Sequence, residues 1–136
     1  DEYRAWGIEA TKTWPVARFW DFSIGATWMR AEERDKKAAW SRSRAPDWDI
    51  DTSFIYQNGP VQGQLTINYF GNREAGEGVE SNVTTVDASI GYKRGTSTLR
   101  LSVYNLFDKE YWGDEFSGTY YYGPERRIYL SWEYLF

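Results

Sequence analysis

Strict alternation of apolar and polar residues is the feature that most constrains the fold of this chain. In residues 127–136 every second residue is apolar: Ile128, Leu130, Trp132, Tyr134 and Phe136. The residues between them are mostly polar: Arg127, Tyr129, Ser131, Glu133 and Leu135. A period of two places alternate side chains on opposite faces of an extended strand. This segment is therefore predicted to be a β-strand with one apolar face.

The same alternation recurs in six upstream segments, at about 3–14, 20–29, 48–57, 64–69, 85–93 and 99–104. With the last segment they predict seven strands and an all-β, antiparallel fold. Tight turns are expected at 14–17, 58–60 and 94–97, which contain the Gly, Pro and Asn that such turns require. Long polar connections are expected at about 30–46, 71–82 and 109–125.

Short and long connections thus alternate strictly, which is typical of outer-membrane barrels with short turns at one rim and long loops at the other. A soluble sandwich or a lipocalin has no reason to sort loop length by rim. The aromatic residues also fall into two groups. Near the short turns lie Trp14, Trp20, Tyr56, Tyr92 and Phe136; near the long loops lie Trp6, Trp28, Trp48 and Tyr69.

Two aromatic belts with aliphatic residues between them predict girdles around a lipid-facing band. The composition agrees, because 19% of the residues are aromatic although the mean hydropathy is only −0.70. A carbohydrate-binding β-sandwich would share this composition, and its apolar set would form a packed core. We therefore predict a transmembrane β-barrel, with a soluble barrel or sandwich as the alternative.

The chain contains neither Cys nor His. This removes thiolate chemistry, the usual general base and the commonest metal ligand. A net charge of −4 does not favour nucleic acid as a partner. We expect no enzyme activity, no cofactor and no metal site; Asp47, Asp49 and Asp51 imitate a calcium loop but have Thr52 where its Gly would stand.

Residues 99–136 carry a more specific pattern, which resembles the C-terminal end of TonB-dependent receptors. The shared elements are an Asn-Leu-Phe-Asp run, a following Tyr, a Pro-x-Arg element and a final strand that ends in Phe. Here they are Asn105, Leu106, Phe107, Asp108, Tyr111, Pro124, Arg126 and Phe136. Glu125 stands where the family usually has Gly.

The resemblance implies a barrel of about 22 strands with an internal plug. Residues 1–136 would then be the last seven strands, with the plug absent. It also implies a bacterial outer-membrane receptor that uses energy from TonB to import a scarce ligand, such as an iron–siderophore or cobalamin-type complex. The alternatives are a small outer-membrane barrel or porin of another family and a soluble lectin-like domain.

The resemblance also suggests sites. Loops of this kind contact the incoming ligand in the family, which makes Trp112, Tyr120, Tyr121 and Tyr122 candidates for ligand contact. These rings would otherwise extend the outer girdle or pack on neighbouring loops. Basic residues of the first long loop are candidates for binding lipopolysaccharide phosphates: Lys36, Lys37, Arg42 and Arg44. The last strand, through Leu130, Trp132, Tyr134 and Phe136, resembles the signal that the barrel-assembly machinery recognises.

Overall fold

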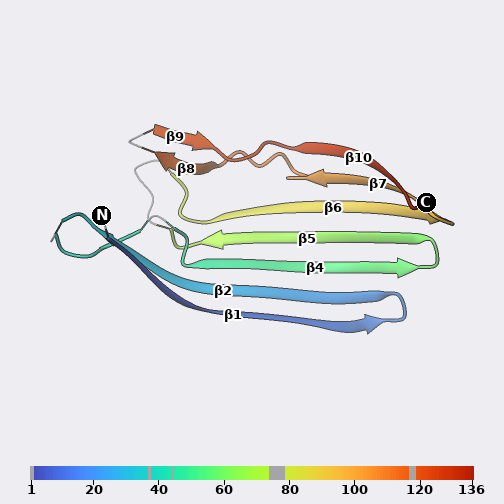
Figure 1. The fold of residues 1–136 in the computed structure, drawn as a ribbon, viewed down its shortest axis with the longest axis horizontal. Helices are drawn as coiled ribbons and strands as arrows, with labels where there is room; N and C mark the ends of the chain where they lie inside the picture. The colour runs from blue at the N-terminus through green and yellow to red at the C-terminus, as the bar shows by residue number, and fades with distance from the viewer. Residues whose placement is uncertain (1, 37, 44, 74–78, 117–118) are drawn as a thin grey trace.

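The chain folds into a single curved antiparallel sheet with a small hairpin beside it (Figure 1). The computed structural model describes residues 2–36, 38–43, 45–73, 79–116 and 119–136. The sheet order is β1-β2-β4-β5-β6-β7-β10. Its strands are β1 (Glu2–Ala17), β2 (Trp20–Arg34), β4 (Trp48–Asn58), β5 (Val61–Gly71), β6 (Val83–Arg94), β7 (Ser97–Tyr104) and β10 (Arg127–Tyr134).

Three short strands complete the fold. β3 (Ser41–Arg42) pairs with β2, and β8 (Trp112–Phe116) pairs with β9 (Thr119–Tyr122) as a separate hairpin. The all-β, antiparallel prediction is confirmed, and the seven predicted strands are all present, whereas β3, β8 and β9 were not predicted. β1 and β10 are the two edges of the main sheet, which is open in the described residues. No helix that is long and apolar enough to cross a membrane occurs in the described part of the chain.

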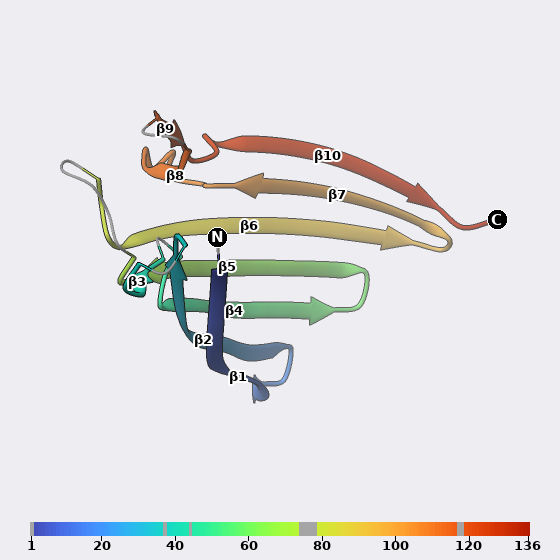
Figure 2. The same ribbon diagram turned by 60° about the vertical axis from the view of Figure 1, so that its left-hand side comes forward.

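Short and long connections alternate as predicted and lie at opposite ends of the sheet (Figure 1). Residues 18–19, 59–60 and 95–96 form what we call the short-turn rim. The described residues among 35–47, 72–82 and 105–126 form the long-loop rim, which also holds the β8–β9 hairpin (Figure 2).

Three predicted boundaries were wrong. The turn expected at 14–17 lies at residues 18–19, because Pro15 pairs with Asp21 and a register shift follows before Ala17. Proline is tolerated there because β1 is an edge strand. The loop expected from residue 30 begins only after Arg34, since charged pairs such as Arg4–Glu32 continue the β1–β2 ladder. Residues 109–125, expected to be a loop, contain the β8–β9 hairpin.

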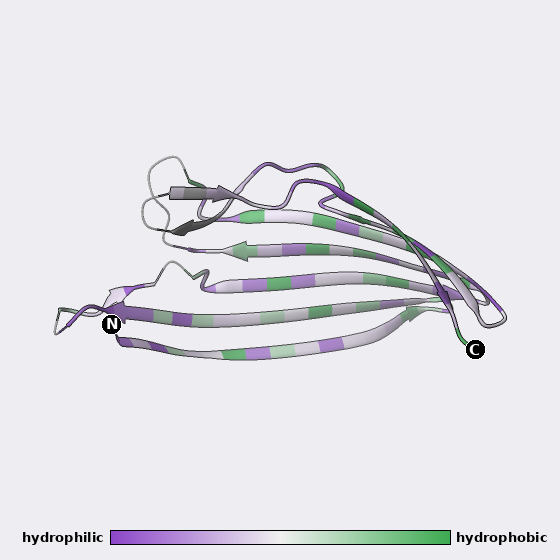
Figure 3. Ribbon diagram, turned by 45° about the horizontal axis from the view of Figure 1, so that its top comes forward, coloured by the Kyte–Doolittle hydropathy of each residue, from purple (hydrophilic) through white to green (hydrophobic). Residues whose placement is uncertain are grey.

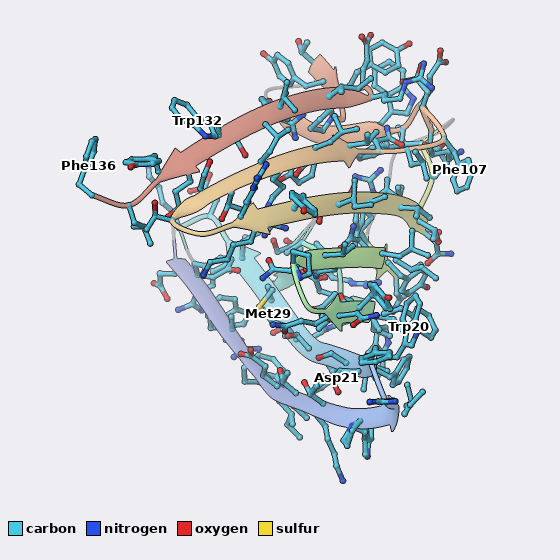
Figure 4. The ribbon with its side chains drawn as sticks, turned by 90° about the vertical axis from the view of Figure 1, so that its right-hand side faces the viewer. Trp20, Asp21, Met29, Phe107, Trp132 and Phe136 are labelled. Carbon is cyan, nitrogen blue, oxygen red and sulfur yellow. The ribbon has the colours of Figure 1, made fainter. Side chains whose placement is uncertain are left out.

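The register collects the apolar residues on one face of the sheet. Residues directly opposite each other on neighbouring strands project from the same face. One such row is formed by Trp14, Phe22, Phe54, Leu65, Ala88, Val103 and Ile128. Figure 3 shows the alternation of apolar and polar residues along the strands, and Figure 4 shows Trp20 and Trp132 on the convex side and Met29 on the concave side.

Among the described residues, no second layer lies over this convex apolar face. Leu130 and Ile8 are 71% and 72% exposed, and the buried hydrophobic residues in the described part of the chain are Ala31 and Val83. The concave face is instead polar and internally hydrogen-bonded. Ser53 lies 2.8 Å from Thr66, and Asn68 donates to Asp87 at 2.9 Å.

Aromatic residues bound the convex apolar face on several strands. The bounding residues lie eight positions apart: Trp6 and Trp14 on β1, Trp20 and Trp28 on β2, and Trp48 and Tyr56 on β4. We call the outward-facing residues between these boundaries the apolar band. Aromatic rings contact each other along the edge of the band nearest the short-turn rim, with centroids 5.6 Å apart for Trp14–Phe22 and 4.9 Å apart for Trp20–Tyr56.

The strands are inclined to the line of these aromatic residues. The row of directly paired residues runs across the strands and starts at Trp14, the boundary of the band on β1. On β6 the same row reaches Ala88, whereas the boundary of the band on that strand is Tyr92, four residues further along. Four residues correspond to about 14 Å along a strand, and the four inter-strand steps to about 19 Å across the sheet. The strands therefore tilt by about 35° from the normal to the band.

Candidate functional site

The long-loop rim beside β7 and β10 holds most of the residues singled out from the sequence. Asn105 ends β7 with a positive φ of 51°, a conformation that Asn tolerates better than most residues. Its side chain is buried, accepts from the Lys109 amide at 2.9 Å, and donates to the carbonyls of Lys109 (2.9 Å) and Pro124 (3.0 Å). One side chain thus joins both ends of the segment that connects β7 to β10.

Asp108 makes a second connection across the same segment. Its amide donates to the Asn105 carbonyl at 2.9 Å, and its carboxylate accepts from the Arg126 amide at 2.9 Å. The Arg126 guanidinium lies 3.6 Å from the other carboxylate oxygen. Asn105, Asp108, Pro124 and Arg126 therefore form one cluster, which we call the base cluster. It fixes where the chain enters the last strand.

Asp87 extends the base cluster onto the concave face of the sheet. Its carboxylate accepts from the Asn105 amide at 2.8 Å and from the Asn68 side chain at 2.9 Å. This role of Asp87 was missed from the sequence, because its partners Asn68 and Asn105 lie 19 and 18 residues away along the chain. Leu106 donates its amide to the Val86 carbonyl at 2.7 Å, whereas the Phe107 side chain is 74% exposed and lies outside the cluster (Figure 4).

Tyr111 packs where the loop returns toward β10. Its ring lies 5.8 Å from that of Phe70, and a Cβ on Gly123 would come within 2.2 Å of it. Gly123 is therefore required for this close approach. Burial raises the pKa of the Tyr111 phenol, although the charge of Arg127 partly opposes the shift, so the phenol is neutral at pH 7.

The β8–β9 hairpin presents the aromatic residues that the sequence suggested for ligand contact. Trp112 and Tyr122 stack with ring centroids 4.1 Å apart and planes 19° apart. Tyr121 and Tyr122 are exposed, at 54% and 67%. The side chain of Tyr120 lies outside the described residues, although its backbone belongs to β9. The described rings form a solvent-facing aromatic platform at the long-loop rim.

Arg73, which the sequence did not single out, holds this hairpin in place. Its buried guanidinium donates to the carbonyls of Glu80 (2.8 Å), Gly113 (2.9 Å) and Trp112, and lies 5.3 Å from the Phe70 ring centre. The neighbouring Glu80 carboxyl accepts hydrogen bonds from the backbone amides of Glu80 itself and of Trp112, and these bonds lower its pKa. Arg73 offered no sequence signal, because all three acceptors are backbone carbonyls and two of them lie about 40 residues further along the chain.

The first long loop is held by charge pairs within the chain. The Asp47 carboxylate, which is buried, lies 2.8 Å from Arg42 and 3.6 Å from Arg30, and accepts from Asn72 at 2.7 Å. Arg42 is thus paired internally, while Lys37 and Arg44 lie outside the described residues. In the described part of the chain no three His, Cys, Asp or Glu side chains form a group that would hold a metal ion.

The last strand carries Leu130, Trp132 and Tyr134 on the convex face, and Phe136 follows the end of the strand. Leu130 and Trp132 are about 70% exposed, and the Trp132 indole donates to Ser97 at 2.7 Å. Ring contacts continue from Trp132 to Tyr134 (6.2 Å) and from Tyr134 to Phe136 (5.2 Å). Because β10 is an edge strand, this apolar row lies beside unpaired backbone groups.

Comparison with protein-family models, with curated proteins and with solved structures gave no match to this chain.

The base cluster predicts unequal effects for two neighbouring substitutions in the intact protein. Asn105→Ala removes the bonds to Lys109 and Pro124 and places Ala at positive φ, which should cost about 2–3 kcal/mol of local stability. Phe107→Ala, the matched control, should change local stability by less than about 0.5 kcal/mol. Hydrogen exchange of the amides at 105–111 measures both. Equal exchange in the two variants would contradict the role assigned to Asn105.

Proposed function

We propose that this chain is part of the wall of a bacterial outer-membrane β-barrel, and that the barrel is a TonB-dependent uptake receptor. Its ligand would be a scarce metal chelate or a cobalamin-type complex, bound without chemical conversion. The observation that carries the membrane part of the proposal is the apolar band on the convex face.

The dimensions of the band match a bilayer. Counted with its two aromatic boundaries, the band is nine residues long, which falls in the range of about 9–11 residues that a tilted transmembrane strand needs. At a tilt of about 35° such a strand spans a height of about 22 Å, against an apolar band of about 25 Å in outer-membrane barrels. The tilt itself is also in the range of about 35–45° that these barrels show.

Exposure of the convex face also supports a non-aqueous environment. Soluble monomers rarely expose contiguous apolar patches larger than a few hundred Å². Here the outward-facing Ile, Leu, Trp and Phe residues of all seven strands are continuous across the sheet. A soluble lectin-like domain would have to cover this face with a second layer, whereas a bilayer covers it directly.

The edge strands indicate a larger barrel. β1 and β10 both run from the long-loop rim to the short-turn rim, because an odd number of antiparallel strands separates them (Figure 1). Direct pairing of β10 with β1 would therefore be parallel. Antiparallel pairing of β1 with a second copy of β1 would invert one copy relative to the membrane. An antiparallel barrel thus needs an odd number of further strands.

The receptor part of the proposal rests on the resemblance of residues 99–136 and on the geometry of the long-loop rim. The aromatic platform of Trp112, Tyr121 and Tyr122 lies at the rim expected to face the exterior, on a hairpin fixed by Arg73. TonB would act through a part of the protein outside this chain. The barrel-assembly machinery would recognise β10, whose open edge and alternate rings suit recognition by strand addition.

The membrane assignment predicts opposite responses at two adjacent residues of β5. Leu65 lies at the centre of the band, between Val61 and Tyr69, and Gln64 faces the concave side. Leu65→Arg should destabilise the intact protein in vesicles by about 2–4 kcal/mol, whereas Gln64→Arg should be tolerated. Urea titration of the vesicle-inserted protein measures the difference. Equal stability of the two variants would contradict the lipid-facing assignment.

The receptor assignment is tested by uptake. The test uses a panel of ferric siderophores, each as the only iron source, and cyanocobalamin as the only cobalamin source. Cells that lack the intact protein should fail to grow with at least one of these compounds. Replacing Trp112, Tyr121 and Tyr122 together by Ala should weaken binding of that ligand by about tenfold or more, because exposed rings serve as rigid anchors. Phe107→Ala, an exposed ring of the same connecting segment, is the matched control.

The amount of each variant in the outer membrane is measured in parallel. Normal binding by the triple variant would show that the platform is not the ligand site. No uptake defect for any member of the panel would contradict the receptor assignment while leaving the membrane assignment untouched.

A further inference from the structure

The convex face is not uniformly filled, and a hollow of about 310 Å³ opens in its short-turn half. Gly63 lies at its floor, because Gly63 is the outward-facing residue between Tyr56 and Ile90 and has no side chain. The walls include Trp20, Phe54 and Leu65, and the surface of the hollow is almost wholly apolar. A Cβ on Gly63 would approach no atom closer than 3.7 Å, so backbone packing does not require glycine there.

The charges at the same end of the convex face all have one sign. Among the described outward-facing and turn residues of this half, the charged side chains are Lys12, Arg18 and Arg94, and none is Asp or Glu. Lys12 and Arg18 lie over aromatic rings, at 5.2 Å from Trp14 and 5.0 Å from Phe19. The Lys12 ammonium thus reaches from within the band toward the short-turn rim, as a snorkelling lysine does.

The long-loop end of the convex face differs in this respect. There the outward-facing charges are mixed and neutralise one another, with Arg4 donating to Glu32 at 2.8 Å and Arg34 to Glu2 at 2.9 Å. The short-turn rim is therefore the end that carries unneutralised positive charge facing outward. Such a rim is complementary to the phosphates of a phospholipid leaflet.

We infer that the hollow over Gly63 binds one acyl chain of a phospholipid whose phosphate is held by Arg94. This inference rests on the proposed membrane location. Ile90, which lines the hollow, and Arg94 project from the same face of β6 and are four residues apart, or about 14 Å. A lipid with its head group at the short-turn rim therefore places its chain in the hollow while its phosphate reaches Arg94.

The occupant follows from the lining. The hollow offers an apolar groove, and its polar lining residues, Tyr56, Gln64 and Ser89, contribute almost nothing to its surface. Its volume is near the lower end of the range of about 300–1,000 Å³ for ligand pockets, which suits part of an acyl chain rather than a whole amphiphile. The positive charge lies only at the head-group end, as a phospholipid requires.

The test uses the intact protein in detergent, titrated with phosphatidylglycerol and, separately, with diacylglycerol that has the same acyl chains. Native mass spectrometry counts the bound lipid. Gly63→Leu fills the hollow and should weaken binding of both lipids by about tenfold. This is the loss expected when about two methylene groups of the acyl chain are no longer buried. Thr52→Leu, on the same face but outside the hollow, is the matched control and should leave binding unchanged.

The phosphate contact is tested separately. Arg94→Gln should weaken binding of phosphatidylglycerol by about fivefold, the effect of one basic residue at an anionic lipid surface, and leave diacylglycerol binding unchanged. Arg18→Gln is the control, a rim cation on another turn. If Gly63→Leu binds lipid as well as Thr52→Leu, the acyl-chain site is refuted. If the Arg94→Gln variant binds phosphatidylglycerol as tightly as the Arg18→Gln variant does, the phosphate assignment is refuted.

Failure of the lipid site is distinguishable from failure of the membrane location. Insertion of each variant into lipid vesicles is measured alongside lipid binding. A protein that inserts normally but shows equal lipid binding in all variants loses only the lipid site. A protein that remains in the aqueous phase without detergent contradicts the membrane location itself, and the lipid site with it.

Discussion

The fold depends on the register of seven antiparallel strands in a single layer. Because side chains alternate with a period of two, a slip of one residue between any two strands would move a whole apolar set to the concave face. The observed register instead joins these sets into one continuous convex surface, from Trp14 on β1 to Ile128 on β10. The residues that the structure describes form no second layer over that surface, which is why we propose that lipid covers it. The proposed membrane location, and the lipid site within it, follow from this one constraint.

The concave face and the long-loop rim use polar interactions for a different purpose. Asp87 connects the concave face to the base cluster, and Arg73 connects the hairpin to the preceding loop. Arg73 donates to backbone carbonyls and Asp87 accepts from the Asn105 amide, so the loop geometry is fixed largely through the backbone while the Tyr121 and Tyr122 side chains face solvent. A rigid base with an exposed aromatic platform is an arrangement suited to ligand capture.

The sequence predicted the parts of the structure that local pattern determines. Alternation located all seven main strands, and Gly59 and Gly95, both at positive φ, mark the turns that were placed correctly. The turn near Pro15 was misplaced because proline is acceptable in an edge strand, and edge position is a property of the whole sheet. The hairpin was missed because Trp112–Tyr122 has no clear alternation, and its position depends on Arg73, far away in sequence. The tilt and the hollow over Gly63 depend on register, which no single segment encodes.

The most direct test of the membrane location is a spin-label scan of β6, residues 83–94, in the intact protein reconstituted into lipid vesicles. Collision rates with oxygen, which partitions into lipid, and with a water-soluble nickel complex report the environment of each position. If the convex face lies in lipid, oxygen accessibility is high and nickel accessibility is low at Val86, Ala88 and Ile90. Oxygen accessibility is lower at the intervening Asp87 and Ser89, with the alternation ending beyond Tyr92. Nickel accessibility at Val86, Ala88 and Ile90 equal to that of a water-exposed loop residue would contradict the account.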